Sequence, residues 1–567
     1  MNKNTVFVTL TLMLSAIVPL RSAAAGPPVE DEIELESTSL PIVIIDTGGA
    51  DIPDVRRIAA RMSIIYNGPG AVNRITDLPA HYDGRISIEL RGSSSLQFPK
   101  KQYALETQDS LGNNLNISLL GLPEENDWIL YDPYSDKSLL RNVLVYRIAR
   151  KMGRYASRTR FCELVLNGRY WGIYVLMEKI KRDGDRVDIS RLDSSEVDGD
   201  ALTGGYIIKV DKTAGENNEG WRSPHPPFAN TNKKILYQYH YPKPDEIVPQ
   251  QAAYIQAKIA GFEDLMASPG YADPDTGYSR LIDVDSFVDF FIINELSRNV
   301  DAYRLSAFMY KDRDSEDGRL FMGPVWDFNL AFGNANYYNA SLISGWQLEY
   351  FRDAEEFHQA DGFQMPFWWG RLWQDEDFLN KVYRRWWALR WDDLRTDRLL
   401  RTIDAMVDTL GPALERNFIK WPVLGTYVWP NWFIGMTYEE EIDYLKNWIQ
   451  NRIEWMDGHL RLGPSPVDAA APDPGSGLEL HQNMPNPFNS QTIITCELRS
   501  PGQVKIEIYN LLGQHIRTLF DGERNAGLLR VRWDGRDRFG TIVPAGVYTC
   551  RLTARAALLT RKMLFLR

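Results

Sequence analysis

Cysteine is scarce in this chain, and its scarcity excludes a disulfide-stabilised scaffold. The 567 residues include three cysteines, Cys162, Cys496 and Cys550. Small extracellular domains held together by disulfides carry an even number of cysteines at a much higher density. Cys496 and Cys550 could pair with each other near the C-terminal end, and Cys162 is interpreted as a buried strand residue rather than a reactive thiol.

Long apolar runs are also missing after residue 25, which excludes a membrane-spanning helix from the rest of the sequence. Such a helix needs about 18 or more predominantly apolar residues. Residues 1–25 have a positive start at Lys3, an apolar run over residues 6–20 and small residues at 22–25. This pattern is typical of a secretory signal peptide. We therefore expect an exported protein, secreted or held at the cell surface, with no transmembrane span in its mature form.

Three further motifs are absent, and their absence excludes three classes of catalytic site. None of the seven histidines is followed by another histidine four residues later, and neither Gly-x-Ser-x-Gly nor Cys-x-x-Cys occurs. These gaps exclude a zincin helix, a hydrolase nucleophile elbow and a redox dithiol. The net charge of -11, with no basic stripe to offset it, excludes nucleic acid as the expected partner.

Aromatic residues are abundant, with 17 Trp and 27 Tyr. In a chain of this size most of them are expected in the core. The segment Phe367-Trp-Trp-Gly-Arg-Leu-Trp373 is interpreted as a packing helix. The alternative is a sugar-stacking platform, in which Trp368 and Trp369 would make the protein a glycan-binding surface module.

Composition changes divide the chain into five parts. Residues 1–25 are the expected signal, and residues 26–39 form an acidic tether that begins with Pro. Residues 40–462 form the main body. Residues 463–477 have the Pro, Ala, Gly and Ser content of an extended linker, and residues 478–567 form a separate C-terminal domain.

The main body changes from strands to helices along its length, which predicts an α+β fold. Strands are expected at residues 40–45, 85–90 and 204–210, and a hairpin at 161–177 turns at Asn167-Gly168. Apolar residues at helical spacing predict helices over residues 136–152, 252–266, 284–296, 375–389, 397–417 and 438–460.

The C-terminal segment has a different pattern. Short alternating strands are separated by turn sequences such as Asn486-Pro-Phe-Asn and Asp534-Gly-Arg-Asp. About seven strands of this kind predict an all-β sandwich of immunoglobulin-like type.

Two acidic segments carry the most informative chemistry. The first is Asn299-Val-Asp301-Ala-Tyr-Arg-Leu-Ser306, and the second is Gly323-Pro-Val-Trp-Asp327-Phe-Asn329. A phosphoryl-transfer site needs one carboxylate to orient the attacking hydroxyl and another to hold magnesium. We expect Asp301 and Asp327 to converge at a junction between the strand-rich and helix-rich halves.

The surrounding sequence resembles the CotH kinase family of spore-coat CotH-like proteins. The matching stretches include Arg91-Gly-Ser-Ser-Ser-Leu-Gln-Phe-Pro-Lys100-Lys101, Tyr134-Ser-Asp136-Lys-Ser-Leu-Leu-Arg141-Asn142, Glu163-Leu-Val-Leu-Asn-Gly-Arg-Tyr-Trp-Gly and the two acidic segments. The resemblance implies a two-lobed, atypical protein-kinase-like domain. It also implies an enzyme that uses ATP and Mg²⁺ and transfers the γ-phosphoryl group to Ser or Thr of a protein acceptor.

The resemblance also implies roles for individual residues. Asp301 matches the catalytic base, and Asp327 matches the metal-binding Asp. Lys209 or Lys101 would meet the phosphates, with Glu178 as a possible ion-pair partner. Arg91 is a further phosphate candidate, because its guanidinium fork suits phosphate oxygens.

Two residues depart from the pattern that the resemblance implies. Ser306 stands where kinase-like sites place a metal-binding Asn, and Asn329 stands where the family often has Asp. A hydroxyl is a poorer metal ligand than a carbonyl oxygen, and Asn lacks the charge of Asp. These departures support an alternative, a catalytically silent kinase-like fold used for surface binding or envelope assembly.

The C-terminal domain resembles the sorting domains of type IX secretion substrates and FlgD-like immunoglobulin domains. The resemblance is carried by Gln482-Asn-Met-Pro-Asn-Pro-Phe-Asn489, Ile508-Tyr-Asn-Leu-Leu-Gly513 and Pro544-Ala-Gly-Val-Tyr-Thr. It implies a bacterial protein that the type IX machinery carries across the outer membrane.

Overall fold

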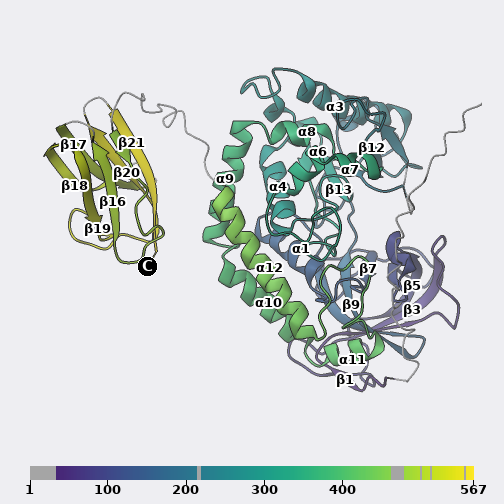
Figure 1. Ribbon diagram of the computed structural model, residues 1–567. Coiled ribbons are helices and arrows are strands. Elements are labelled where there is room, and N and C mark those ends of the chain that lie inside the picture. The colour runs from purple at the N-terminus through teal and green to yellow at the C-terminus, as the bar shows by residue number, and fades with distance from the viewer. Residues whose placement is uncertain are drawn as a thin grey trace, which may run out of the picture. The chain divides into compact units, whose positions relative to one another are not determined.

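The computed structural model describes residues 33–213, 219–460, 478–498, 501–510, 514–554 and 557–566. The expected signal and linker lie outside these residues, as does the first part of the acidic tether. The chain divides into two compact units, Met1–Arg461 and Leu462–Arg567. Figure 1 shows mixed strands and helices in the first unit and strands in the second. Across the described ranges, no helix is long and apolar enough to cross a membrane.

A closed barrel forms one end of the first unit. Its strands follow the order β2 (Ile42–Asp46), β3 (Ile58–Ile65), β5 (Tyr82–Arg91), β6 (Gln102–Gln108), β7 (Asp127–Tyr131), β9 (Arg169–Glu178) and β8 (Thr159–Leu166). The parallel pairing of β2 with β8 closes the ring, and the other neighbours are antiparallel. Apolar side chains such as Ile88, Trp128 and Leu176 fill the interior. Cys162 also lies there, which confirms that it is a buried strand residue.

The hairpin predicted at residues 161–177 is confirmed as β8 and β9. Asn167 and Gly168 both have positive φ angles, 50° and 75°. A two-residue hairpin loop of this kind matches the right-handed twist of its strands, and Asn-Gly adopts it at low cost. The turn therefore sets the register of the last two barrel strands.

Helix α1 (Arg141–Lys151) connects β7 to β8 and begins later than the predicted 136–152. Residues 136–140 form turns instead. The Asp136 carboxylate accepts the backbone N–H of Arg141 at 2.8 Å and pairs with the Arg141 guanidinium at 2.5 Å. Because Asp136 satisfies backbone donors at the start of the helix, the helix can begin at Arg141.

A second sheet lies in the same unit, in the order β11 (Gly220–Arg222), β12 (Leu236–Tyr241), β10 (Tyr206–Val210), β13 (Ala307–Lys311) and β14 (Phe321–Met322). Helix α4 (Val284–Ser297) contacts β14 and is buried along nearly its whole length. Its apolar residues, among them Phe287, Phe291 and Ile292, are therefore buried in the core, and its buried acids Asp289 and Glu295 are paired with arginines. Helix α3 (Pro249–Ala267) packs against α8 (Phe367–Leu372).

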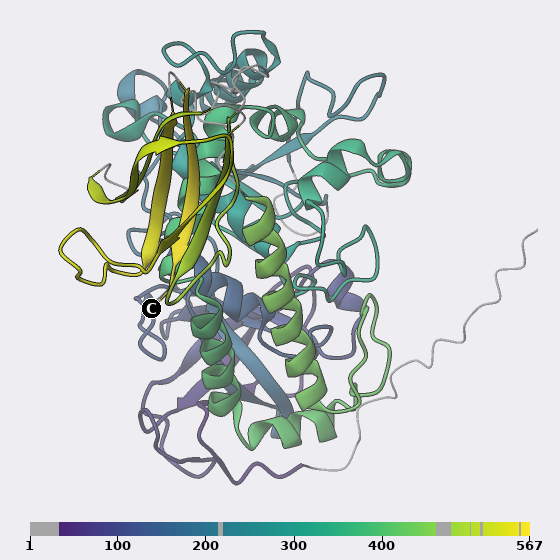
Figure 2. The ribbon, with the colours of Figure 1, turned by 60° about the vertical axis from the view of Figure 1, so that its left-hand side comes forward.

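The remaining helices include α6 (Gln347–Asp353), α7 (Glu355–Ala360), α9 (Glu376–Trp391), α10 (Thr396–Leu410), α11 (Ala413–Lys420) and α12 (Tyr438–His459). Figures 1 and 2 show α12 running along one side of the unit toward the barrel end. The single helix predicted over residues 397–417 is wrong. Gly411, with φ 45°, and Pro412 divide it into α10 and α11, because Pro tends to start a new helix rather than continue one.

Short elements complete the first unit: β1 (Ser37–Thr38), β4 (Asn73–Arg74), α2 (Gly199–Leu202), α5 (Asp314–Asp317) and two 3₁₀ turns, Ser94–Gln97 and Tyr278–Arg280. Trp368 and Trp369 of α8 are 1% and 0% exposed. Rings so deeply buried cannot stack on a sugar, so the glycan-platform alternative is wrong for these two residues.

The second unit contains two antiparallel sheets. One has the order β15 (Leu478–Leu480), β16 (Thr492–Leu498), β19 (Gly527–Trp533), and the other β18 (His515–Arg524), β17 (Gly502–Asn510), β20 (Gly546–Ala554), β21 (Ala557–Phe565). Their facing side chains share one core, which includes Cys496, Cys550 and Trp533. An all-β domain was expected here. Cys496 and Cys550 are both free thiols, so the pairing considered from the sequence is not formed.

A buried ion pair joins two helices of the first unit. The Arg452 guanidinium of α12 lies 3.2 Å from the Glu295 carboxylate of α4, and both side chains are 0% exposed. Glu295 also accepts the backbone N–H groups of Gln347 and Leu348 at 2.8 and 2.9 Å. One carboxylate therefore holds α4, α6 and α12 together.

We expect Arg452→Met to lower the free energy of unfolding of the first unit by about 3–5 kcal/mol, because the Glu295 charge would remain buried without its cation. Denaturant unfolding of the purified chain measures the change. Asn447→Met, at an exposed position of the same helix, serves as the control and should change stability by no more than about 0.5 kcal/mol. Equal effects of the two variants would contradict the assigned role of the ion pair.

Candidate functional site

Three carboxylates from separate segments lie near one another in the first unit. Asp301 lies in the connection from α4 to β13, Asp327 in the loop after β14, and Asp211 directly after β10. The charges of Asp301 and Asp211 both raise the pKa of Asp327. The structure thus brings together the two acidic segments singled out from the sequence, and it adds a third acid.

The backbone around this cluster is strained. Four residues have positive backbone φ angles: Arg298 (44°), Tyr303 (66°), Ser306 (48°) and Asp327 (63°). Residues other than Gly rarely adopt this left-handed conformation. Strain of this kind persists only where the surroundings enforce it, and it clusters at functional sites. Tyr303 and Ser306 lie in the first acidic segment, Asp327 lies in the second, and Arg298 directly precedes the first. This placement supports a functional hypothesis for both segments.

Helix α1 holds the loop that carries Asp327. The backbone N–H of Asp327 donates to the Tyr146 hydroxyl at 3.3 Å, and that of Phe328 donates to the Asn142 side chain at 2.6 Å. The Arg141 guanidinium donates to the Ala331 carbonyl at 3.0 Å. One face of α1 therefore fixes the position and the left-handed conformation of Asp327.

The Asp327 carboxylate is partly buried, and it makes no hydrogen bond or ion pair with any residue in the described ranges. Desolvation is the main cause that raises its pKa to about 6, and the Asp301 charge adds to the effect. Lys212 and Arg91 partly oppose the rise. A carboxylate that is desolvated without a bonded partner is suited to receive a cation or a proton.

Asp301 has a different environment. One carboxylate oxygen accepts from the Arg304 guanidinium at 3.1 Å, and Arg304 also pairs with Asp361 at 3.0 Å. The backbone N–H of Asp301 donates to the Asn299 side chain at 3.2 Å. Arg304 therefore fixes the orientation of this carboxylate, as is needed in a group that orients a hydroxyl.

Arg91, at the end of barrel strand β5, faces the same cluster. Its guanidinium lies 5.6 Å from the centre of the Trp326 ring and donates to the Gln102 side chain at 3.3 Å. Burial lowers the pKa of Arg91, while Asp327 and Asp211 raise it. The barrel thus supplies a cation to carboxylates that come from other parts of the unit.

Lys209 and Ser306 reach the cluster through Asp211. The Lys209 ammonium lies 3.5 Å from one Asp211 oxygen, and the backbone N–H of Ser306 donates to the other at 3.3 Å. Asp211 also accepts the backbone N–H of Lys212 at 2.8 Å. This carboxylate therefore joins the strand β10 to the connection that carries Asp301.

Lys101, Glu178 and Asn329 have other partners. Lys101 donates to the backbone carbonyl of Leu96, and the Asn329 amide donates to the Ser135 hydroxyl at 3.1 Å. Glu178 pairs with Arg158 at 2.7 Å, whereas the sequence suggested Lys209 or Lys101 as its partner. A fully buried carboxylate requires a cation beside it. Arg158 is close enough to supply one, since its backbone N–H also donates to the Glu178 carboxylate, at 2.8 Å.

The side chains of this cluster are of the types that bind a magnesium–nucleotide complex. Carboxylate oxygens are ligands that Mg²⁺ accepts, and Mg²⁺ usually takes one or two carboxylates with water and substrate phosphates as the other ligands. Within the described residues, no group of three or more His, Cys, Asp or Glu is arranged to hold a metal by itself. The desolvated carboxylate of Asp327 and the nearby charges of Arg91, Lys209 and Lys212 match a site that is completed by its substrate.

Sequence reasoning missed Asp211, Lys212 and Tyr146. Asp211-Lys212 directly follows the predicted strand at residues 204–210, and polar residues at the end of a buried strand are a usable signal. Tyr146 gave no such signal, because it occupies one of the apolar-looking positions of a helix.

Comparisons with known proteins give two domain matches. A family model described as CotH kinase protein matches residues 88–456, and one described as FlgD Ig-like domain matches residues 484–557. No curated protein matches this chain.

Three solved structures show weak similarity. Latent PorU from Porphyromonas gingivalis is 17% identical, with 16% of this chain and 9% of that chain covered and a TM-score of 0.14. FlgD from Xanthomonas campestris is 23% identical, covering 16% and 67%, with a TM-score of 0.12. The alkylpurine DNA glycosylase AlkC from Pseudomonas fluorescens is 12% identical, covering 39% and 63%, with a TM-score of 0.13. This chain spans less than a tenth of the PorU chain, and similarities at these scores carry no argument about fold.

The pKa of Asp327 predicts how stability depends on pH. Because the folded-state pKa of about 6 lies above the value of 3.8 for a free carboxyl group, the unfolded state loses this proton first. Stability should therefore fall as pH rises from about 4 to about 6 and stay reduced above that range. Asp327→Asn removes this contribution.

We expect the stability of Asp327→Asn relative to the wild type to increase by about 1–3 kcal/mol between pH 4 and pH 7. Thermal unfolding of both proteins in the presence of a chelator measures the difference. Asp443→Asn, at an exposed position of α12, is the control and should show no such trend. A pH-independent difference for Asp327→Asn would contradict the desolvated state of its carboxyl group.

Proposed function

The chain belongs to the CotH kinase protein family, and from this premise we propose that its first unit transfers the γ-phosphoryl group of ATP to a Ser or Thr hydroxyl of a protein acceptor. The observation that carries the proposal is the convergence of Asp301, Asp327 and Arg91 from three distant segments. Phosphoryl transfer depends on positioning the reactants and on stabilising the charge of the phosphates. The two carboxylates can position the hydroxyl and the metal, and the guanidinium can stabilise the phosphate charge.

Asp301 is the residue that orients the acceptor hydroxyl. Its hydrogen bond to Arg304 holds one carboxylate oxygen in place, which leaves the other oxygen to accept the proton of the attacking hydroxyl. Asp327 binds the metal through its unpartnered carboxylate. Bound Mg²⁺ would neutralise charge on the phosphates.

Arg91 binds the phosphates of the nucleotide. A guanidinium can donate two parallel hydrogen bonds to a phosphate, and a partly buried one does so in an environment of low dielectric. Lys209 and Lys212 are the next candidates, because both adjoin Asp211 at the end of β10. Since Arg91 belongs to the barrel and the lysines to the second sheet, the nucleotide would lie between two parts of the unit, as in a two-lobed kinase-like arrangement.

A second candidate is a silent kinase-like fold that binds a partner or takes part in envelope assembly. The side chains of Ser306 and Asn329 support it. Ser306 bonds to Asp211 through its backbone, and the Asn329 amide bonds to Ser135. Neither the Ser306 nor the Asn329 side chain carries a negatively charged oxygen that would strengthen metal binding.

The second unit supports a proposal about location. Its match to an FlgD Ig-like domain agrees with a role in delivery or attachment. We infer that the protein is exported, that the type IX secretion machinery recognises the C-terminal domain, and that the mature protein is secreted or held on the bacterial surface.

A thermal-shift titration separates the two functions of the first unit. We expect ATP and Mg²⁺ together to stabilise the wild type by about 2–3 kcal/mol at a ligand concentration about 100 times Kd. Asp327→Asn should lose most of the dependence on Mg²⁺, whereas Asp443→Asn should keep it. No stabilisation of the wild type by ATP and Mg²⁺ would favour the silent fold.

Transfer itself is tested with radiolabelled ATP and dephosphorylated casein as a general Ser/Thr acceptor, with labelling of the chain itself measured in parallel. We expect Asp301→Asn to reduce phosphate incorporation by about 10²–10⁴-fold while nucleotide binding remains within about threefold of the wild type. Asp443→Asn should transfer at the wild-type rate. Unchanged incorporation in Asp301→Asn would remove this residue from the mechanism.

A further inference from the structure

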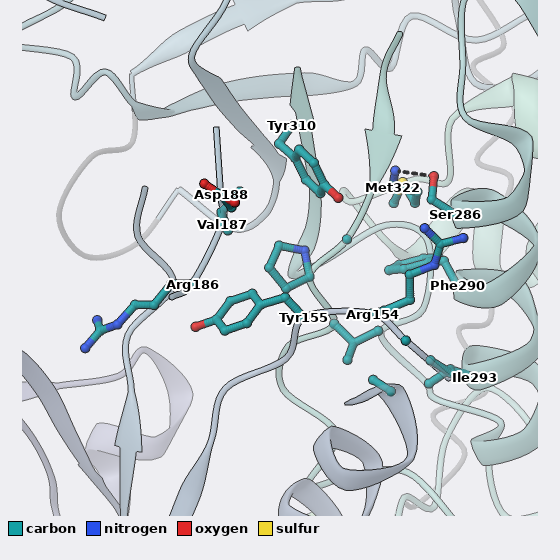
Figure 3. Close-up of a pocket in the computed structure, with 15 residues that line it drawn as sticks. Arg154, Tyr155, Arg186, Val187, Asp188, Ser286, Phe290, Ile293, Tyr310 and Met322 are labelled. Carbon is teal, nitrogen blue, oxygen red and sulfur yellow. Dashed lines mark hydrogen bonds between the residues drawn. The ribbon is translucent and has the colours of Figure 1, made fainter. Parts of the chain in front are cut away.

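Four arginines line a pocket that the proposed transfer reaction does not use. Arg150, Arg154, Arg158 and Arg186 surround an open hollow of about 310 Å³, together with Gly153, Tyr155, Gly184 and Asp185. A second, more enclosed cavity of about 170 Å³ adjoins it and shares Gly153, Arg154, Tyr155 and Arg186. In Figure 3, Tyr155 extends across the middle of this region with its hydroxyl turned toward Arg186.

Two of the four arginines have no carboxylate partner among the described residues. Arg150 donates through one terminal nitrogen to the carbonyls of Ala156 and Ser157. Arg186 is 3% exposed and donates to the carbonyls of Lys179 and Asp127 at 2.9 and 3.0 Å. A guanidinium carries five N–H donors, so the partly exposed Arg150 retains donors for a ligand. The Arg186 guanidinium also lies 5.3 Å from the centre of the buried Trp128 ring, and it contributes positive charge beside the hollow.

The other two arginines are paired but keep free donors. Arg158 binds the buried Glu178 carboxylate and the Asp185 carbonyl through one terminal nitrogen. Arg154 binds Asp289 through Nε at 2.7 Å, and one of its terminal nitrogens lies 3.6 Å from Asp283. Asp185 and Asp188 are exposed acids at the rim. Burial lowers the pKa of Arg150, Glu178 opposes this, and the charges of Arg158 and Arg160 lower it further. This mutual repulsion would be relieved by a bound anion.

The adjoining cavity is apolar on much of its wall. Phe290, Ile293, Met322, Pro324, Val325 and Val187 line it, and Figure 3 shows Phe290 and Ile293 on the side opposite Arg186. An apolar group in this cavity would leave water, which is favourable in proportion to the area buried. The Tyr155 ring forms a wall shared by the cavity and the arginine-lined hollow.

We propose that this region binds an organic anion, whose phosphate or carboxylate group contacts the arginines and whose apolar group occupies the cavity beside Tyr155. Planar guanidinium groups bind both anions in a bidentate manner. The site differs from the carboxylate cluster, which Arg91 and Lys209 serve. Residues 323–325 line the cavity and lead directly into Asp327, so a ligand there would contact the segment that carries the candidate metal ligand.

Calorimetric titration of the full chain with four probes tests the proposal. We expect phenyl phosphate or benzoate to bind at least about tenfold more tightly than inorganic phosphate or phenol, because the first two probes engage both halves of the site. Preference for phenyl phosphate or for benzoate identifies which anion is recognised. If neither binds more tightly than both inorganic phosphate and phenol, the proposal is overturned.

Substitutions locate the binding site. Arg150→Met should weaken binding of the preferred probe by about tenfold or more, whereas Arg147→Met, on an exposed position of the same helix, should change it by less than about twofold. Arg91→Met should also have less than about a twofold effect. Loss of binding in Arg91→Met with retention in Arg150→Met would put the probe in the carboxylate cluster and overturn the proposal.

A measurement on the wild type covers the case in which Arg150→Met does not fold. Hydrogen exchange with the preferred probe bound should slow at residues 150–158 and 184–188 and stay unchanged at residues 299–306. Protection confined to residues 299–306 would overturn the proposal.

Discussion

The arrangement of the candidate site depends on the bonds between helix α1 and the loop after β14. Arg141, Asn142 and Tyr146 bind the backbone of that loop at Ala331, Phe328 and Asp327. Asp136 in turn fixes Arg141 through both its backbone and its guanidinium. These groups are buried, so each bond is made in an environment of low dielectric and a missing partner would be costly. A left-handed Asp327 is maintained because its neighbours are held in this way.

The same contacts assign a structural role to residues 134–142, one of the stretches on which the resemblance to the family rests. Asp136 and Arg141 are buried and paired with each other, so neither is available to a nucleotide. Their role is to position Asp327, which is partly exposed and has no bonded partner in the described ranges. Residues of both kinds occur in the stretches that resemble the family, and the environment of each side chain in the structure distinguishes a positioning residue from a candidate ligand.

Much of the fold could be predicted from the sequence, because local patterns determine it. The Asn167-Gly168 hairpin, helices α3, α4, α9 and α12, and the β domain at the C-terminal end follow from turn chemistry and periodicity. The closed barrel could not be predicted, since the pairing of Ile42 with Glu163 is not local. For the site, Asp301, Asp327 and Arg91 were anticipated, but Asp211 was not. Its importance arises from contact with Ser306, which is distant in sequence.

The parallel pairing of β2 with β8 also constrains the order in which the chain can fold. Strand β2 is synthesised before every other strand of the barrel, yet its final neighbour on one side appears only after β3, β5, β6, β7 and α1 have been made. Until then β2 presents an unpaired edge, which is open to association with other chains. Closure must also overcome the entropy of a long loop, which slows folding. The ring can therefore close only after β8 and β9 have been made, and a nascent chain interrupted before residue 159 retains an open edge.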